Sequence, residues 1–321
     1  RVHHYERTLC EGSADGTAIN PARMAELDNL LNACIEHGIY LTTDLFVSRV
    51  VPYRSCGIDK DGAIAMDEFK ELAVFHEGTR SNLVAFTRQL LGHVNPKTGR
   101  RWAEEPALAW LSLVNEGNPG NHGWRKSKTW LGLPEGLSDA EMTKRAVEKE
   151  IAFCRFMKKE LRDLGFKGLV TDMNCWHNPP EYQKVRAEYD YVDDHFYVDH
   201  PRFLEKSWRL PSKNDNRNPL RYSNRGVEWN FPVRLADKPF TLTEYNFSGP
   251  GVYRGIGGIA TGAIAAREDW DGLWRFAWSH SKEGVDAPAS CRMDYFNMNA
   301  ILAFLVKAKT VQRWAELDAS K

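Results

Sequence analysis

Short apolar segments alternate with amphipathic segments of helical period along almost the whole chain. An apolar run of about four to eight residues between turn signals predicts a buried strand, and apolar residues three or four positions apart predict a helix. The segments with strand character are 1–6, 39–46, 107–115, 168–174, 189–198, 240–245 and 272–279. Helices are expected at 21–37, 66–91, 138–165, 255–267 and 295–306, a short helical turn at 179–186, and loops at 47–65, 117–137 and 206–228.

Local signals define the ends of two of these helices. Asn20 precedes Pro21 and Gly38 follows the last apolar position, an order typical of an N-cap, a first helical residue and a helix stop. Ser138, with Glu141 three residues later, forms a capping-box pattern. The long segment 66–91 is expected to break around residues 76–80.

Strands that are nearly all followed by helices predict a parallel sheet covered by helices. A nucleotide-binding sheet is disfavoured, because no glycine-rich turn follows the first strand and no phosphate-binding loop motif occurs. The alternative is an eight-stranded (β/α)8 TIM barrel. We expect residues 1–321 to form a single catalytic barrel domain that supplies the second to eighth strands, with the first strand upstream of Arg1.

Charge and length narrow the possible partners. The 43 basic and 43 acidic side chains cancel, so no global field attracts nucleic acid or an anionic membrane. The chain has no apolar run of about 18 residues, which is the length that a membrane-spanning helix needs. The six cysteines are scattered without a C-x-x-C pair, which argues against a zinc ribbon and leaves their disulfide state open. For Cys34 and Cys175, buried thiols are expected.

Two glutamates follow apolar strands of the predicted barrel. Glu116 stands in the sequence Asn115-Glu116-Gly117 after the strand 107–115, and Glu244 lies near the end of the strand 240–245, on the same face as Leu242 if side chains alternate. Functional groups of a barrel project from the C-terminal ends of its strands. A carboxylate there is partly buried, which is costly unless the group has a partner or a role.

Other strands also carry polar and aromatic side chains at spacings of two. The residues that share a face are His3 and Tyr5; Asp193, His195 and Tyr197; and Trp274, Phe276 and Trp278. Glycoside hydrolysis needs a carboxylic acid to protonate the departing oxygen and a carboxylate to attack the anomeric carbon or activate water. In a retaining enzyme the two carboxyl groups lie roughly 5 Å apart, so they must converge from different strands.

In its order of motifs, the chain resembles clan A glycoside hydrolases, most closely family five. The shared order is an Arg at an early strand, Asn-Glu after an apolar strand, a later His-x-Tyr, a Thr-Glu-Tyr strand and a strand that ends in Trp. The resemblance implies retaining hydrolysis of a β-linked oligo- or polysaccharide by double displacement, without a cofactor or metal. Glu116 would be the acid/base, Glu244 the nucleophile, and Asn115 the residue that binds the sugar 2-hydroxyl.

The resemblance also implies a set of residues that bind substrate or hold the nucleophile. Arg1 and Tyr197 would donate hydrogen bonds to Glu244, His195 would line the site, and Trp278 would form the floor of the −1 subsite. His3 is a further substrate-binding candidate. The loop residues Trp124, Trp130 and Trp176 are either outer platforms for sugar rings or ordinary loop anchors.

One position departs from the family pattern. Family five members usually carry a His shortly after an Asp near the end of the third strand, whereas here Asp44 is followed by Leu45 and Phe46. His3 and His4, with the following Tyr5 and Glu6, are expected to supply compensating polar groups. The segment Asp59-Lys60-Asp61-Gly62 is expected to be a turn, because it lacks the remaining acidic ligands of a calcium loop.

Two other functions compete with this interpretation. A metal-dependent barrel hydrolase could use His3, His4, His195 and His200, although adjacent residues on a strand cannot both face inward. A carbohydrate-binding pseudoenzyme is the other alternative, because fold alone does not establish function. The partner expected in each carbohydrate-based case is a sugar, and a secreted, periplasmic or cell-surface location is favoured. The sequence does not determine the sugar, the linkage or the oligomeric state, and internal cleavage is preferred over terminal cleavage.

Overall fold

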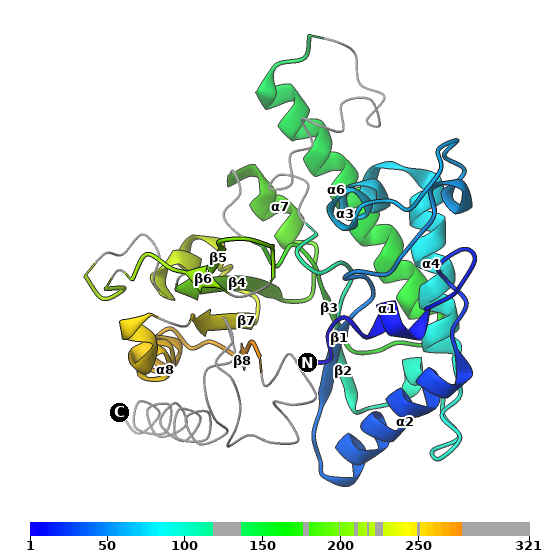
Figure 1. Cartoon of the computed structure of the whole chain (residues 1–321), viewed down its shortest axis with the longest axis horizontal. Helices are drawn as coiled ribbons and strands as arrows, with labels where there is room; N and C mark the ends of the chain where they lie inside the picture. The colour runs from blue at the N-terminus through cyan, green and yellow to red at the C-terminus, as the bar shows by residue number, and fades with distance from the viewer. Residues whose placement is uncertain are drawn as a thin grey trace. The chain divides into compact units, whose positions relative to one another are not determined.

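The structure is a computed structural model of the chain. It describes residues 1–117, 136–175, 180–198, 200–208, 211–216, 218–221, 227–248 and 251–277. The chain divides into two compact units, residues 1–192 and 193–321, each with its own sheet (Figure 1).

The first unit is organised around a parallel sheet. Its strands are β1 (Leu41–Asp44), β2 (Leu108–Ser112) and β3 (Leu169–Thr171), hydrogen-bonded in the order β1-β2-β3. Each matches a predicted strand, with shorter bounds. Because all three run in the same direction, the residues that follow Asp44, Ser112 and Thr171 emerge at one edge of the sheet.

Helices surround this sheet in the order that the amphipathic segments predict. They are α1 (Tyr5–Leu9), α2 (Pro21–Glu36), α3 (Met66–Phe75), α4 (Glu77–Gly92), α6 (Asp139–Asp163) and α7 (Gln183–Arg186), with 3-10 turns η1 (Tyr53–Cys56), η2 (Trp102–Glu104) and η3 (Pro180–Tyr182). The Asn20 side chain accepts hydrogen bonds at the start of α2, and Ser138 with Glu141 forms the capping box of α6. The break between α3 and α4 falls at His76, which has an extended backbone and whose side chain accepts from the N–H of Thr79. The predictions of α2, the break between α3 and α4, and the α6 capping box are confirmed.

The prediction of a strand over residues 1–6 is wrong. Only Val2 pairs with the sheet, through a parallel bridge to Thr43, and the chain then turns at His4, which has a left-handed φ of 59°, into α1. The buried Glu6 of α1 accepts hydrogen bonds from the backbone N–H groups of residues 47, 48 and 49. This anchor for the loop after β1 requires a helix at residue 6, and no local pattern in the sequence indicates it.

Phe46, which stands where family five members carry His, belongs to the core of the first unit. Its ring stacks on Phe69 with centroids 3.9 Å apart, and both side chains are fully buried. The buried guanidinium of Arg49 lies 4.7 Å from the ring of Phe86. Stacked aromatic pairs such as Phe46 and Phe69 contribute about 0.5–1.5 kcal/mol beyond the burial of their surface, so Phe46 stabilises the fold.

The second unit has a sheet of its own in the order β4-β7-β8. Its strands are β4 (Val192–Val198), β7 (Phe240–Phe247) and β8 (Gly272–Arg275), and a short antiparallel ribbon joins β5 (Arg202–Phe203) to β6 (Ser212–Lys213). The helices are α8 (Gly257–Arg267) and the 3-10 segments η5 (Val227–Val233) and η6 (Val252–Ile256). The sequence predicted β4, β7, β8 and α8 and missed the ribbon. The helix expected at 295–306 lies outside the described residues.

An irregularity in β7 changes the expected alternation of side chains. The parallel register with β8 pairs Leu242 with Leu273 but Tyr245 with Arg275, so three steps along β7 match two along β8. The extra residue lies at Thr243 or Glu244, and such bulges re-aim side chains near functional sites. The expectation that Leu242 and Glu244 share a face assumed an unbroken strand, which the register does not support.

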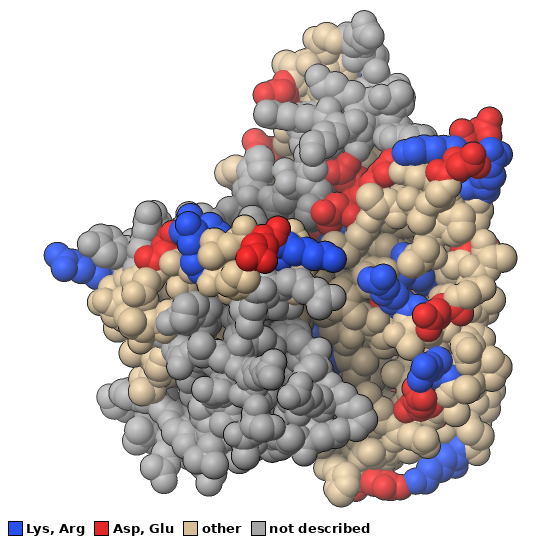
Figure 2. All heavy atoms as spheres, in the orientation of Figure 1, with Lys and Arg blue, Asp and Glu red and all other residues tan. Residues whose placement is uncertain are grey.

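The described cysteines are all buried. Cys10, Cys34, Cys56 and Cys154 are free thiols, Cys175 is buried, and Cys291 lies outside the described part of the chain. None of the helices within the described ranges has the length and hydropathy to cross a bilayer. On the face of the first unit that Figure 2 shows, the described basic and acidic side chains are interspersed, in keeping with the balanced charge.

Candidate active site

The first unit gathers polar side chains at the C-terminal edge of its sheet. Asp44, the last residue of β1, is fully buried and accepts hydrogen bonds at 2.8 and 2.9 Å from the Arg1 guanidinium. The Nδ1 atom of His3 lies 3.0 Å from the same carboxylate. Burial opposes ionisation, but the charge of Arg1 and the contact with His3 outweigh it and hold the pKa of Asp44 well below its usual range.

Arg1 also orients the amide of Asn115. Its Nη2 atom donates to the Oδ1 atom of Asn115 at 2.6 Å. Because the amide oxygen accepts this bond, the NH2 group is the donor end of the side chain. The buried Asn115 can therefore donate to a hydroxyl oxygen, as its predicted contact with a sugar 2-hydroxyl requires.

Glu116 lies in a tight turn directly after this asparagine. Its φ of 51° is left-handed, and its backbone N–H donates to the Oδ1 atom of Asn174 at 2.7 Å. The following residue must be glycine, because a Cβ at Gly117 would lie 2.6 Å from the Cβ of Val114 and 3.0 Å from Asp172. The turn thus sets the direction of the half-buried Glu116 side chain.

Two buried carboxyl groups in the first unit were not predicted from the sequence. Burial, with a smaller contribution from the charge of Asp172, raises the pKa of Glu150 well above its usual value. Burial likewise raises the pKa of Asp172. Glu150 shares the buried face of α6 with Ala146, Phe153 and Met157, so the helical period of residues 138–165 could have identified it.

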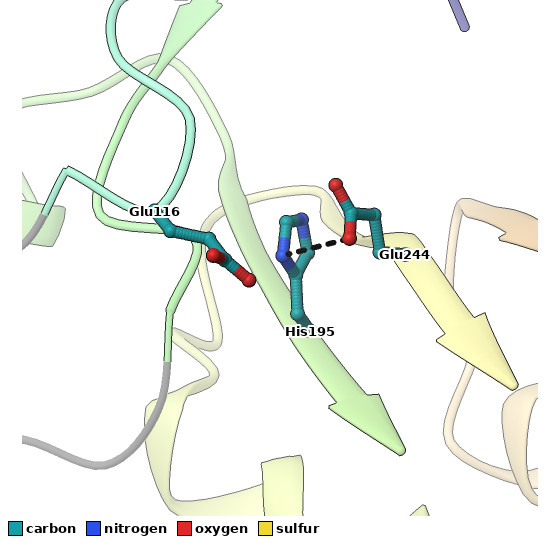
Figure 3. A group of neighbouring side chains, drawn as sticks. All are labelled: Glu116, His195 and Glu244. Carbon is teal, nitrogen blue, oxygen red and sulfur yellow. Dashed lines mark ion pairs between the residues drawn. The ribbon is translucent and has the colours of Figure 1, made fainter. Parts of the chain in front are cut away.

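The second unit holds Glu244 in the C-terminal half of β7. The hydroxyl of Tyr197, on β4, donates to the Oε2 atom of Glu244 at 2.5 Å. The Nδ1 atom of His195 lies 3.7 Å from the same oxygen, as the dashed line in Figure 3 marks. Glu244 is 4% exposed. A hydrogen bond from a neutral hydroxyl favours the charged form of a buried carboxylate and fixes its orientation.

The strands β4 and β7 share further polar contacts. His195 Nε2 lies 3.1 Å from the hydroxyl of Thr243, and that hydroxyl also contacts the carboxylate of Asp193. The strand pattern predicted that Asp193 and His195 share a face but gave no sign of Thr243. The contact of Thr243 depends on the register of two strands about 50 residues apart, which the sequence does not reveal.

The remaining site candidates fall into two groups. Tyr197 and Phe276 make an edge contact with ring centroids 6.3 Å apart, and the carbonyl of Phe276 accepts from the amide of Asn246 at 2.7 Å. The aromatic residues proposed to bind sugar rings lie outside the described residues: Trp124, Trp130, Trp176 and Trp278.

Glu116 and Glu244 belong to different units, so their pairing, and the predicted Arg1–Glu244 contact, stay predictions.

The histidines considered as metal ligands have other partners in the described residues. His3 contacts Asp44, and the adjacent His4 contacts the hydroxyl of Ser48 at 2.7 Å. His200 Nδ1 lies 3.0 Å from the carbonyl oxygen of Pro201. A cation at Asp44 would have to compete with the bound guanidinium of Arg1.

The Asp59–Gly62 segment has the geometry of a turn. Asp59 and Asp61 accept hydrogen bonds from the exposed Arg54 at 2.8 and 3.0 Å. Gly62 has a left-handed φ of 89°, which glycine adopts without strain. The turn prediction is confirmed.

Comparison with solved structures identifies the fold. An endo-β-1,4-mannanase from Thermotoga petrophila matches with a TM-score of 0.57 and 16% identity over 96% of this chain. This chain spans only 63% of the length of that mannanase. An endo-1,4-β-mannanase from Rhizomucor miehei matches with a TM-score of 0.56 and 14% identity over 95% of this chain and 79% of its own. A mutant glycoside hydrolase family 5 mannosidase from the same organism, in complex with mannosyl-fructose, matches with a TM-score of 0.60 and 11% identity. The match covers 99% of this chain and 83% of the mannosidase.

These likenesses show that the chain has the fold of glycoside hydrolase family 5 structures. The resemblance that the sequence indicated is thus confirmed at the level of fold, as is the mixed α/β class with parallel strands. No protein-family model matches the sequence, and no curated protein sequence matches it significantly.

Proposed function

We propose that the chain is the catalytic barrel of a retaining β-glycoside hydrolase, with Glu116 as acid/base and Glu244 as nucleophile. The observation that carries the proposal is the Tyr197–Glu244 hydrogen bond of 2.5 Å. It gives a nearly buried carboxylate, in the C-terminal half of the parallel strand β7, the neutral donor that a nucleophile needs to stay oriented. A residue that served only the packing of the core would not need a carboxylate here.

The proposed reaction has two displacements. In the first, the Glu244 carboxylate bonds to the anomeric carbon as the glycosidic C–O bond breaks, and Glu116 gives its proton to the leaving oxygen. In the second, Glu116 takes a proton from water, the water oxygen bonds to the anomeric carbon, and Glu244 is released. One water molecule is consumed and no cofactor is needed. The mechanism requires the two carboxyl groups to lie roughly 5 Å apart in the assembled barrel.

The first unit supplies the polar groups around the acid/base. Asn115 would donate to the sugar 2-hydroxyl, a bond that strengthens in the transition state. Arg1 bonds to Asp44 and Asn115, which suits a role in orienting that amide. His3 would contribute through Asp44. A direct bond from Arg1 to Glu244 is a further element of the proposal.

The proposed architecture and substrate class follow from the same resemblance. Residues 1–321 would form a single (β/α)8 domain. Because the similar structures include mannanases and a mannosidase, a β-linked mannoside is the first substrate to test. The loop residue Trp124 and Trp278, at the end of the last predicted strand, would bind the sugar rings.

Product release from β-mannan, β-glucan, xylan and aryl β-glycosides tests the proposal. Wild type is compared with Glu244→Gln and with Glu205→Gln, an exposed glutamate of the same unit that serves as the matched control. We expect wild type and the control to release sugar, and Glu244→Gln to lose roughly four orders of magnitude or more in kcat, as removal of a nucleophile does in other hydrolases. A 2-fluoro glycoside should label Glu244, which peptide mass spectrometry detects.

Two outcomes would favour the other functions. Activity that survives Glu244→Gln and is lost with a chelator would support the metal-dependent hydrolase. Sugar binding without hydrolysis by the folded wild type would support the pseudoenzyme. Thermal melting of each variant separates loss of activity from loss of fold.

A further inference from the structure

Three buried polar side chains of the second unit form a continuous chain that ends beside Glu244. Asp193, Thr243 and His195 are 0%, 4% and 1% exposed. The hydroxyl of Thr243 contacts the Oδ2 atom of Asp193 on one side and the Nε2 atom of His195, at 3.1 Å, on the other. Groups buried this deeply must satisfy their hydrogen-bonding capacity inside the protein, so the donor and the acceptor of each of these contacts can be assigned.

The Asp193 carboxylate accepts three hydrogen bonds from one strand. The hydroxyl of Thr241 donates at 2.7 Å and the backbone N–H of Thr243 at 2.9 Å, both to Oδ1, while the hydroxyl of Thr243 donates to Oδ2. An ionised carboxylate only accepts hydrogen bonds, and several donors that converge on it favour that form. Asp193 is therefore the acceptor in each of these contacts.

The single hydrogen of the Thr243 hydroxyl then decides whether the Nε2 atom of His195 carries a hydrogen. A hydroxyl has one hydrogen to donate and two lone pairs. Because that hydrogen is directed to Asp193, the oxygen can only accept from His195, and the Nε2 atom must carry the hydrogen. The opposite tautomer would place two lone pairs against each other at 3.1 Å in a buried site.

We propose that Asp193 and Thr243 are positioning residues that keep a hydrogen on the Nε2 atom of His195, so that the neutral form of the ring is the Nε2–H tautomer. In this neutral form the Nδ1 atom, 3.7 Å from the Oε2 atom of Glu244, is a hydrogen-bond acceptor, and the Tyr197 hydroxyl donates to that same oxygen. The catalytic meaning rests on the proposed function, whereas the tautomer assignment does not.

The two threonines differ in their position relative to His195, which provides matched variants. Thr243→Val removes the hydroxyl between Asp193 and His195 and keeps the branched shape. Thr243→Ser keeps the hydroxyl. Thr241→Val removes a different donor, the hydroxyl that bonds to the Oδ1 atom of Asp193.

Nitrogen NMR of the full-length protein, with selectively ¹⁵N-labelled histidine, tests the tautomer directly. We expect the neutral ring of His195 in wild type to show a pyrrole-like Nε2 and a pyridine-like Nδ1, with the signals assigned by their loss in His195→Asn. Thr243→Ser and Thr241→Val should keep this pattern, and Thr243→Val should give a mixture of tautomers. A wild-type Nδ1–H tautomer, or a folded Thr243→Val variant with an unchanged pattern, would overturn the proposal.

Kinetics then tests the link to the proposed function. On the substrate that wild type cleaves, Thr243→Val should lower kcat by about tenfold, the lower end of the range seen when the hydrogen-bond partner of a metal-ligating histidine is lost, and Thr243→Ser should restore it. If no substrate is cleaved but the tautomer pattern holds, the proposed function fails and the tautomer assignment stands. If wild type is active and Thr243→Val matches it in both kcat and tautomer, the positioning role is excluded.

Discussion

The backbone N–H of Glu116 donates a 2.7 Å hydrogen bond to the side-chain oxygen of Asn174. The bond joins the turn after β2 to the turn after β3, 58 residues further along the chain. Glu116 has a left-handed φ of 51°, a conformation that costs a non-glycine residue roughly 1–2 kcal/mol. Asn174 is fully buried, so its amide can hold the proposed acid/base in this conformation.

Asn174→Ala should therefore impair catalysis more than substrate binding. Without the amide oxygen the Glu116 N–H loses its partner, and the side chain is no longer held in one direction. We expect kcat to fall by about tenfold and the free energy of unfolding by about 1–3 kcal/mol, with KM little changed. Steady-state kinetics and urea unfolding measure the two effects.

Two further variants help to interpret that result. Asn174→Asp keeps an acceptor oxygen at the same position and should recover part of kcat. Asn29→Ala, which removes an exposed amide on α2, controls for loss of an asparagine as such. If Asn174→Ala has wild-type kcat, the turn holds Glu116 without this bond.

Tyr197→Phe should reduce activity without loosening the fold. The change removes the hydroxyl that donates to Glu244 and keeps the ring that contacts Phe276. A hydrogen bond to a charged group contributes about 1.5–3 kcal/mol, which corresponds to a fall in kcat/KM of roughly 10- to 100-fold. Tyr40→Phe, at a 74% exposed position, is the control. Equal activity of both variants would show that Glu244 does not depend on Tyr197.

Glu150→Gln should stabilise the protein increasingly as the pH rises. Burial raises the pKa of Glu150 well above its usual value, so from about pH 4.3, the usual pKa of Glu, upwards the folded state binds more protons than the unfolded state. The contribution of this group to stability is then complete at low pH and is lost as the pH rises toward its folded-state pKa. Glutamine resembles the protonated acid and has no such loss.

Urea unfolding at pH 4, 6 and 8 measures this effect. The advantage of Glu150→Gln over wild type should grow across the series by an amount on the order of 1 kcal/mol or more. Glu148→Gln, on the exposed side of the same helix, should show no such trend. A constant difference between Glu150→Gln and wild type at all three values would contradict the raised pKa.

Asp44→Asn should destabilise the first unit with the opposite pH dependence. Arg1 and Asp44 have side chains only 6% and 0% exposed, and breaking a buried ion pair from one side costs about 3–5 kcal/mol. The pKa of Asp44 is depressed, so its contribution is present above about pH 3.9, the usual pKa of Asp, and is lost as the pH falls toward its folded-state pKa.

The difference in unfolding free energy between wild type and Asp44→Asn should accordingly be largest near pH 7 and shrink toward pH 2. Asp59→Asn removes a carboxylate that is 91% exposed and also paired with an arginine, and such exposed pairs contribute about 0–1 kcal/mol. A loss for Asp44→Asn no greater than for this control would mean that Arg1 finds another partner.

The sequence by itself determined the features that depend on local pattern. The alternation of β1, β2, β3, β4, β7 and β8 with helices, the caps at Asn20 and Ser138, and the break at His76 all follow from periodicity and from residues within one helical turn. The placement of Glu116 after β2 and of Glu244 in the C-terminal half of β7 also follows from strand patterns.

Only the tertiary structure decided which residues hold these side chains. Asn174 holds Glu116, Thr243 lies between Asp193 and His195, and Glu6 draws residues 5–9 into a helix where a strand was expected. Each of these contacts joins segments about 40 to 60 residues apart. They depend on strand register, a bulge in β7 and left-handed turns. Local periodicity carries no information about them, because a shift of one residue in register exchanges the two faces of a strand without changing its sequence.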